Sequence, residues 1–446
     1  MSAKAVMTVR GAVGSAAQSV SWVLPHEHLV HNIYAALPSD VKRQGSGGED
    51  RNGASGLNEI SPHQLSELRL NPLMFDGRNL VLEREDEIFR EAEVVLTTQG
   101  RSGIIVDVTT PREGRDVSKL RRLSERLDVH IIASTSVNES VLATLPPSCS
   151  SEEKSERIAK MMETELKFGT GDAQTEACAG VVYQQVHLGS DSSHSINDVV
   201  LRGLAMAQTS TGAPIYLSFS ADDKSSPDTM SPRILQYIRM LTDFGANPSQ
   251  VVLCHSDLWS GTKLGLEFLV ETARLGVSLC FNLVGLYTAS DVVITNACSA
   301  PIGFDCEPPG DSAIARCISA LIRDHNAIDR ILVSSGVHQR VQFRRYGGGG
   351  YGYALRQFKE RLTRYHGVTL PDWNRIINQN PMRLLAWYSP PEAVPIPKHF
   401  LKCSICANFF EPIVGEYFTK FQFTYCGTKC LRKHSKMGFK PLATET

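Results

Sequence analysis

The chain has 446 residues, of which 42% are hydrophobic and 21% charged, and its formal net charge is -1. This length exceeds what a single hydrophobic core usually organises, so we expect one large domain with a smaller appendage. The balanced charge excludes a global field that would recruit nucleic acid or anionic lipid. Apolar runs are short at the N-terminus and elsewhere, so we expect neither a signal peptide nor a membrane span.

Short β-branched runs alternate with stretches at helical spacing from about residue 20 to residue 390. The predicted strands cover residues 22–24, 104–106, 130–133, 180–183, 214–217, 251–255, 277–281 and 331–334. This alternation is typical of βα units around a parallel sheet, and eight strands predict an α/β fold, a closed TIM (β/α)8 barrel. A doubly wound open sheet is the alternative. Its nucleotide-binding form is not supported, because no GxGxxG follows an early strand.

Polar segments mark the expected loops and the domain boundary. Residues 44–56, 146–155 and 220–231 are rich in glycine, serine, acidic residues or proline, and we predict loops there. Prolines crowd between residues 389 and 399, which is typical of a linker. We therefore predict a barrel over residues 1–388, a proline-rich linker over 389–399 and a separate module over 400–446.

The 11 cysteines are distributed unevenly. Seven are scattered over the first 400 residues, several of them inside apolar segments, which is typical of reduced thiols. We therefore expect an intracellular, cytoplasmic protein. The other four lie from Cys403 onward, so the tail is chemically distinct.

Histidines stand at the ends of two predicted strands. His26 and His28 follow the first strand at alternate positions, so both side chains can point to one face and hold one cation. His255 ends the sixth strand, and Asp257 follows two residues later. The His26 and His28 pattern alone is equally typical of ordinary polar residues, and a lone histidine such as His255 is more often a hydrogen-bonded strand end than a ligand. We interpret Asp257 as a helix cap or as a support for a ligand.

These segments belong to a larger set of collinear motifs. The set comprises His26-Glu27-His28-Leu29, Val108-Thr109-Thr110, Gly114-Arg115-Asp116, Thr211-Gly212-Ala213-Pro214, His255-Ser256-Asp257, Tyr346-Gly347-Gly348, Gly350-Tyr351, Asn380-Pro381, Arg383 and Leu384. In these motifs the chain resembles the phosphotriesterase family of the amidohydrolase superfamily, and in particular its phosphotriesterase-related branch. The resemblance covers most of residues 20–390 and implies a barrel descended from metal-dependent hydrolases.

The resemblance also implies a binuclear metal site built from six side chains: paired histidines, a bridging carboxylate or carboxylated lysine, two more histidines and an aspartate. Three ligands are retained, namely His26, His28 and His255. The other three positions carry replacements: Gln184 for the bridging group, Ser218 for the fifth-strand histidine and Gly336 for the eighth-strand aspartate. An amide lacks the anionic oxygen that offsets repulsion between two divalent ions, and glycine cannot orient an attacking water.

A shifted register could offer His187 or His338 as replacement ligands. Strand periodicity places His187 on the face opposite to Gln184, and His338 matches a position of its own in the family pattern. Neither histidine is therefore expected to substitute for a lost ligand.

Two hypotheses about the barrel follow. In the first, the protein is a pseudoenzyme with no catalytic residue, and the barrel serves as a scaffold. In the second, His26, His28 and His255 hold a single metal, and the protein is a zinc-dependent hydrolase of an ester, amide or phosphoester bond. Noncatalytic binding of a small molecule in the barrel mouth is a third hypothesis.

The tail carries a zinc-binding pattern. Cys403 and Cys406 form a CxxC pair, and Cys426 and Cys430 form a CxxxC pair. Four thiolates in a short segment suit a tetrahedral ion, so we predict one structural zinc in a treble-clef-like zinc module, with His434 as the alternate ligand. The second half of this pattern is similar to zinc fingers of the MYND and HIT types.

A basic helix is expected after the second cysteine pair. It carries Lys429, Arg432, Lys433, Lys436 and Lys440. A solvated face is the simplest interpretation and a contact with a protein is the next, whereas these charges are too few to indicate nucleic acid. We therefore expect a protein partner at the zinc module.

Overall fold

The computed structural model describes residues 4–14, 20–37, 60–70, 72, 77–137, 139–146, 148–171, 176–188, 191–220, 226–286, 309–389, 401–406, 409–413, 415 and 417–439. The chain divides between Ser389 and Pro390 into two compact units, which are described separately. The predicted loop at residues 44–56 and the linker beyond Ser389 lie outside the described residues.

Eight parallel strands form the centre of the first unit. They are β3 (Trp22–Glu27), β6 (Gly103–Asp107), β7 (His130–Thr135), β8 (Ala179–His187), β9 (Ile215–Ser220), β10 (Val251–Leu253), β11 (Ser278–Phe281) and β12 (Ile331–Val333). Each strand pairs in parallel with the next one along the chain. The eight predicted strands and the barrel are therefore confirmed. The open doubly wound alternative is wrong, because its strand order would reverse at a switch point.

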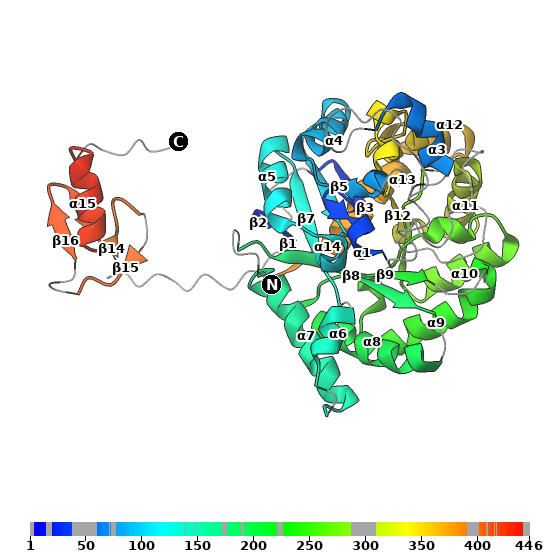
Figure 1. Ribbon diagram of the computed structural model, residues 1–446, viewed down its shortest axis with the longest axis horizontal. Helices are drawn as coiled ribbons and strands as arrows, with labels where there is room; N and C mark the ends of the chain where they lie inside the picture. The colour runs from blue at the N-terminus through cyan, green and yellow to red at the C-terminus, as the bar shows by residue number, and fades with distance from the viewer. Residues whose placement is uncertain are drawn as a thin grey trace. The chain divides into compact units, whose positions relative to one another are not determined.

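Helices alternate with these strands and surround them (Figure 1). Between successive strands lie α4 (Glu85–Gln99), α5 (Val117–Leu127), α7 (Ser151–Lys167), α8 (Asp191–Thr211), α9 (Pro227–Asp243), α10 (Lys263–Arg274) and α11 (Asp311–Arg323). Shorter helices are α1 (Ile33–Ala36), α3 (Leu65–Leu70), α6 (Glu139–Thr144), α12 (Lys359–Tyr365), α13 (Leu370–Asn374) and α14 (Asn380–Leu385). None of the helices in the described part of the chain has the length and apolar character needed to cross a bilayer.

Two predicted loops end earlier than expected, because the sequence caps helices inside them. The Ser150 hydroxyl accepts from the Glu153 N–H at 3.2 Å, and the Glu153 carboxylate accepts from the Ser150 N–H at 2.7 Å. This reciprocal capping box starts α7 at Ser151. Ser226 caps α9, with Pro227 at its first position. The loop predictions were therefore wrong from Ser151 and from Pro227 onward.

Two apolar layers build the core of the barrel. The inner layer is filled by buried side chains from the strands: Val23, Ile104, Val106, Ile132, Val181, Tyr183, Tyr216, Val252, Cys254, Cys280 and Leu332. The outer layer packs the other strand face against the helices. A small antiparallel sheet of β1 (Ala5–Thr8), β2 (Gly11–Gly14) and β13 (Ala386–Tyr388) accompanies the barrel, as does a pair of β4 (His31–Asn32) and β5 (Val81–Leu82).

Hydrogen bonds to the Glu27 side chain close the gap between the first and last strands. β3 and β12 are the two ends of the hydrogen-bonded strand order. The Ser334 hydroxyl donates to Glu27 Oε1 at 2.7 Å and accepts from the His26 N–H at 3.1 Å. The backbone N–H groups of Ser335 and Val337 also donate to the Glu27 carboxylate, at 2.8 and 2.9 Å. A buried carboxylate with three donors therefore joins the two edges.

The second unit is small. It contains the antiparallel pairs β14 (Leu401–Lys402) with β15 (Phe409–Phe410) and β16 (Phe418–Lys420) with β17 (Phe423–Tyr425). Helix α15 (Thr428–Lys436) follows them. Two hairpins and a helix are the parts of the predicted treble-clef-like fold, which is thereby confirmed.

We expect the Ser334→Ala substitution to destabilise the barrel. It leaves the Glu27 carboxylate without its hydroxyl donor in a fully buried place, so the free energy of unfolding should fall by about 1–3 kcal/mol, measured by urea denaturation. Ser151→Ala, at an exposed position of α7, is the control and should change it by less than about 0.5 kcal/mol. Equal unfolding midpoints for the two variants would contradict the closing role of Ser334.

Candidate functional site

Three predicted metal ligands meet at the carboxyl ends of the barrel strands. The ring centroid of His26 lies 5.6 Å from that of His28 and 5.2 Å from that of His255. His26 is fully buried, and neither of its ring nitrogens has a hydrogen-bond partner among the described residues. The fold therefore gathers these three residues, which are far apart in the sequence, into one polar centre.

Two further histidines extend this centre. The ring centroids of His31 and His338 lie 5.8 and 6.3 Å from that of His28. We call His26, His28, His31, His255 and His338 the histidine cluster. Its members are all buried. His31 was not predicted, although its place three residues after His28 was a visible signal, and His338 had been set aside. His187 lies outside the cluster, with its Nδ1 atom 3.2 Å from the Ser220 hydroxyl.

The histidine cluster is uncharged near neutral pH. Burial is the first cause that lowers the pKa of all five rings, and it brings the pKa of His31 and of His255 to about 3. Positive charge on neighbouring rings would lower the pKa of His26 and His28 further. The cluster is thus a group of neutral rings in contact with one another.

Asn282 determines which nitrogen of His255 carries the proton. Asn282 Oδ1 accepts from the His255 backbone N–H at 2.7 Å, which orients the amide so that Asn282 Nδ2 faces His255 Nδ1 at 2.9 Å. Because an amide nitrogen only donates, Nδ1 accepts, and the neutral ring carries its proton on Nε2. A metal ion requires an unprotonated ring nitrogen. With the proton on Nε2, which has no hydrogen-bond partner among the described residues, His255 could bind a metal only after the Asn282 amide turns.

Strand β8 presents a tyrosine to the cluster. Gln184 Nε2 donates to the Val137 carbonyl at 3.1 Å, and Gln184 Oε1 accepts from the Val137 N–H at 3.1 Å, so this amide binds the segment after β7. Tyr183 belongs to the inner barrel layer, and its ring centroid lies 5.7 Å from that of His26. Burial raises the pKa of Tyr183 well above its usual range, so the phenol is neutral.

The other two altered positions also lack a ligand group. Ser218 is fully buried in β9 and offers only a hydroxyl. Gly336 has a φ of +63°, and a Cβ atom at this position would lie 2.0 Å from the carbonyl oxygen of Asn282. The backbone at Gly336 is therefore closed to an aspartate, or to any other side chain.

Three buried carboxylates near the mouth bind backbone groups. Beside Glu27, the Asp107 carboxylate accepts from the Leu29 N–H at 2.7 Å, and the Asp257 carboxylate accepts from the Asn282 N–H at 2.8 Å. Burial raises the pKa of Glu27 and of Asp257 to about 7 and that of Asp107 to about 6, against hydrogen bonds that lower these values. Asp257 thus supports Asn282, which in turn binds His255.

The barrel residues do not fit a binuclear metal centre. β8 directs a neutral phenol to the cluster, β9 a hydroxyl, and β12 is followed by a glycine that has no room for a side chain. Two divalent ions in one binuclear centre repel each other and need bridging negative charge. None of these groups supplies it.

The four cysteines of the second unit do lie close together. The ligand atoms of Cys403, Cys406, Cys426 and Cys430 all lie within 4.8 Å of one another, and they form the one such group among the described residues. The sulfur of Cys426 is 3.6 Å from that of Cys406 and 3.7 Å from that of Cys430. Burial opposes ionisation of Cys403, but nearby backbone N–H groups lower the pKa of its thiol to about 6. Such a group could bind zinc.

His434 lies in the small core of the second unit. It is fully buried, and its Nδ1 atom is 2.9 Å from the Tyr425 hydroxyl. Its ring centroid lies 4.6 Å from that of Phe423. The ring therefore packs among aromatic side chains and orients α15.

Comparisons with known proteins agree with this division. Residues 4–385 match the model of the "Phosphotriesterase family", and residues 398–442 match that of the "Vms1-associating treble clef domain". N-acetyltaurine hydrolase from Homo sapiens is 27% identical over 312 residues, covering 69% of this chain and 80% of that protein. The phosphotriesterase-related protein of Nematostella vectensis is 29% identical over 373 residues, covering 83% of this chain and 95% of that protein.

Solved structures show the same barrel. A resiniferatoxin-binding protein from Rhodobacter sphaeroides has a TM-score of 0.65 and 27% sequence identity, covering 86% of this chain and 96% of that chain. The phosphotriesterase homology protein of Escherichia coli has a TM-score of 0.56 and 19% identity, covering 82% of this chain and 99% of that chain. The second likeness concerns the fold alone.

We expect Gly336→Ala to lower the free energy of unfolding by about 3 kcal/mol or more, because the new methyl group overlaps the Asn282 carbonyl. Gly367→Ala is a matched control, since Gly367 has a φ of +69° but nothing within 4 Å of its Cβ position. The control should cost only about 1 kcal/mol. Chemical denaturation of both variants measures the difference. Equal losses would mean that the backbone at Gly336 can accept a side chain.

We expect Cys426→Ser to remove zinc from the full-length chain. Loss of one thiolate leaves an incomplete tetrahedral site, so zinc measured by elemental analysis should fall from about one equivalent to nearly none. Cys178→Ser, at a partly exposed cysteine of the barrel unit, is the control and should leave zinc unchanged. A full zinc complement in Cys426→Ser would rule out ligation by this thiol.

Proposed function

The chain belongs to the phosphotriesterase family, and from this premise we propose that it is a pseudoenzyme: the barrel is a scaffold without hydrolase activity, and the zinc module binds a protein partner. One structural zinc belongs to the module, held by Cys403, Cys406, Cys426 and Cys430. The barrel holds no catalytic metal. The unpaired cysteines of the described residues are compatible with the cytoplasm as the site of action.

The observation that carries this proposal is the backbone at Gly336. A missing aspartate could be restored by one substitution if the local backbone still had room for it. Here a Cβ atom would meet the Asn282 carbonyl at 2.0 Å, and the positive φ of Gly336 strains any other residue. The loop after β12 is therefore built without a ligand, and side-chain replacement alone does not regenerate one.

The state of His255 supports the same conclusion. The relatives named N-acetyltaurine hydrolases suggest amide hydrolysis as the activity to test, and a single metal on His26, His28 and His255 is the competing arrangement. That arrangement requires the Asn282 amide to turn so that His255 can release its Nε2 proton. Turning it breaks the 2.7 Å hydrogen bond from the His255 N–H. The neutral phenol of Tyr183 also lies beside His26, where a metal-bound water would need space.

Metal content and turnover of the full-length protein test the proposal together. We expect about one zinc per chain, unchanged by the double substitution His26→Ala and His28→Ala and lost in Cys426→Ser. Hydrolysis of N-acetyltaurine to acetate and taurine should be no faster than in buffer, either with or without added zinc or manganese. Product is measured by NMR over long incubations.

The opposite pattern would support the hydrolase. A second metal equivalent that disappears in the His26→Ala, His28→Ala variant but persists in Cys426→Ser would locate a metal in the barrel. Turnover of N-acetyltaurine, or of other amides, esters or phosphoesters, that is lost in the same variant would overturn the pseudoenzyme. Stabilisation by a small molecule without turnover would instead indicate a binding function for the barrel mouth.

A further inference from the structure

Helix α15 carries four cations on one face. Lys429, Arg432, Lys433 and Lys436 are spaced i, i+3, i+4 and i+7, which places them along one stripe of a helix. All four side chains are exposed. We call these four residues the basic face.

The opposite side of α15 packs against the rest of the module. His434 is buried against Phe423 and bonded to Tyr425, and Cys430 lies among the four clustered cysteines. These contacts set the rotation of the helix about its axis. The basic face is thereby held outward, away from the module's core.

The charges on the basic face work against the helix that carries them. Lys429 lies in the first turn, where the helix dipole favours an anion, and that turn has no acidic residue. Lys429 and Lys433, like Arg432 and Lys436, are like charges at i, i+4, an arrangement that destabilises a helix. Within the described residues no ion pair involves any of the four. A helix surface that serves solubility alone usually carries both positive and negative side chains, unlike the basic face.

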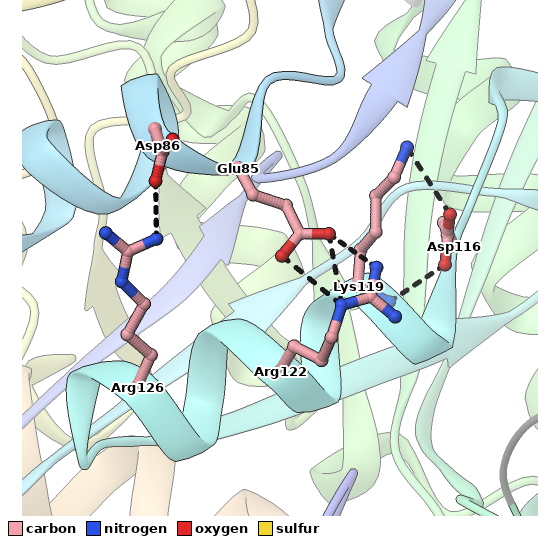
Figure 2. Close-up of polar contacts among 6 residues, drawn as sticks. All are labelled: Glu85, Asp86, Asp116, Lys119, Arg122 and Arg126. Carbon is pink, nitrogen blue, oxygen red and sulfur yellow. Dashed lines mark hydrogen bonds and ion pairs between the residues drawn. The ribbon is translucent and has the colours of Figure 1, made fainter.

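Helix α5 shows how this chain satisfies a similar stripe (Figure 2). Its cations follow the spacing i, i+3 and i+7: Lys119, Arg122 and Arg126. The neighbouring helix α4 begins with carboxylates that meet two of them, with Arg122 Nε 3.1 Å from Glu85 and Arg126 Nη1 2.6 Å from Asp86. Lys119 Nζ lies 3.5 Å from the Asp116 carboxylate. The basic face has a similar spacing, but among the described residues of the second unit no acidic helix lies beside α15.

An exposed aromatic residue lies near the carboxyl end of α15. Phe421 is 73% exposed at the turn between β16 and β17, with a φ of +53°. Its ring centroid is 5.6 Å from that of Phe439, which follows α15. Lys420 Nζ lies 4.3 Å from the centre of the Phe439 ring, and Met437 is 42% exposed. Large apolar side chains are therefore exposed to solvent at one end of the basic face. This combination is typical of protein-binding sites.

We propose that the basic face together with Phe421 binds an acidic protein segment, a helix with carboxylates on one face and an apolar side chain beyond them. This names the partner's chemistry for the protein-binding role of the zinc module and rests on that part of the proposed function. A phosphate backbone is the less suitable occupant. Four cations along about 10 Å of helix neutralise only a few phosphates, and Phe421, at one end of the stripe, does not provide the row of aromatic rings on which successive bases stack.

The test uses the zinc-loaded full-length protein and three labelled probes followed by fluorescence anisotropy. The first probe is a helical peptide with glutamates at the spacing of the basic face and a terminal leucine. The second has glutamine at those glutamate positions, and the third is a single-stranded RNA of similar length. We expect binding of the acidic peptide alone, weakening steeply with added salt.

Matched variants locate the site. Replacing Lys429, Arg432, Lys433 and Lys436 with glutamate should weaken binding of the acidic peptide at least about tenfold, and Phe421→Ala should weaken it about threefold to tenfold. Arg157→Gln with Lys160→Gln, at exposed positions of barrel helix α7, is the control and should not change binding. Elemental analysis of each variant must show an unchanged zinc content, because none of these residues is among the clustered cysteines.

Each other outcome overturns a different statement. Acidic-peptide binding that survives charge reversal would mean that the basic face is not the site. Equal binding of the glutamine peptide would refute an acidic partner but leave a protein-binding module. Binding of RNA in place of either peptide would refute the protein-binding role itself. The pseudoenzyme barrel fails separately, through its metal content and turnover.

Discussion

The buried carboxylate of Glu27 is the contact on which the architecture of the barrel mouth depends. It lies between His26 and His28 in the sequence and joins β3 to the segment after β12 through three hydrogen bonds. A buried carboxylate without donors would be strongly destabilising, so the donors and Glu27 require one another. The same contact directs the flanking histidines. The glutamate of the His26-Glu27-His28 run therefore has a structural role of its own.

Around this contact the histidine cluster forms a packed polar core. The histidine rings are buried and neutral, Tyr183 lies beside them, and Asn282 binds His255 through both its oxygen and its nitrogen. Hydrogen bonds between neutral groups and contacts between rings hold this core together. The rings, the phenol and the amide are neutral, so this part of the core does not have to bury a charge.

The zinc module differs from the barrel in how little hydrophobic core it has. Its described core is little more than His434, Tyr425 and a few neighbouring aromatic residues, which is too little apolar burial for independent stability. The four clustered cysteines could bind zinc, and such an ion would supply the missing free energy of folding. One side of α15 makes the contacts of this core. The other side carries charges that do not stabilise the module.

The sequence by itself determined the eight strands, the place of His26, His28 and His255 at strand ends, and the cysteine group of the tail. These features are local. Hydrophobic periodicity, residues at strand ends and short ligand spacings each depend on residues that are close together in the sequence. Only the tertiary structure decided that Tyr183 rather than Gln184 faces the cluster, that His31 and His338 join it, and that Gly336 has no room for a side chain. Contacts with Val137 and Asn282, far away in the sequence, set the first and the last of these outcomes. The same holds for the cations of α5, because carboxylates of the neighbouring helix α4 meet charges that the sequence of α5 alone leaves open.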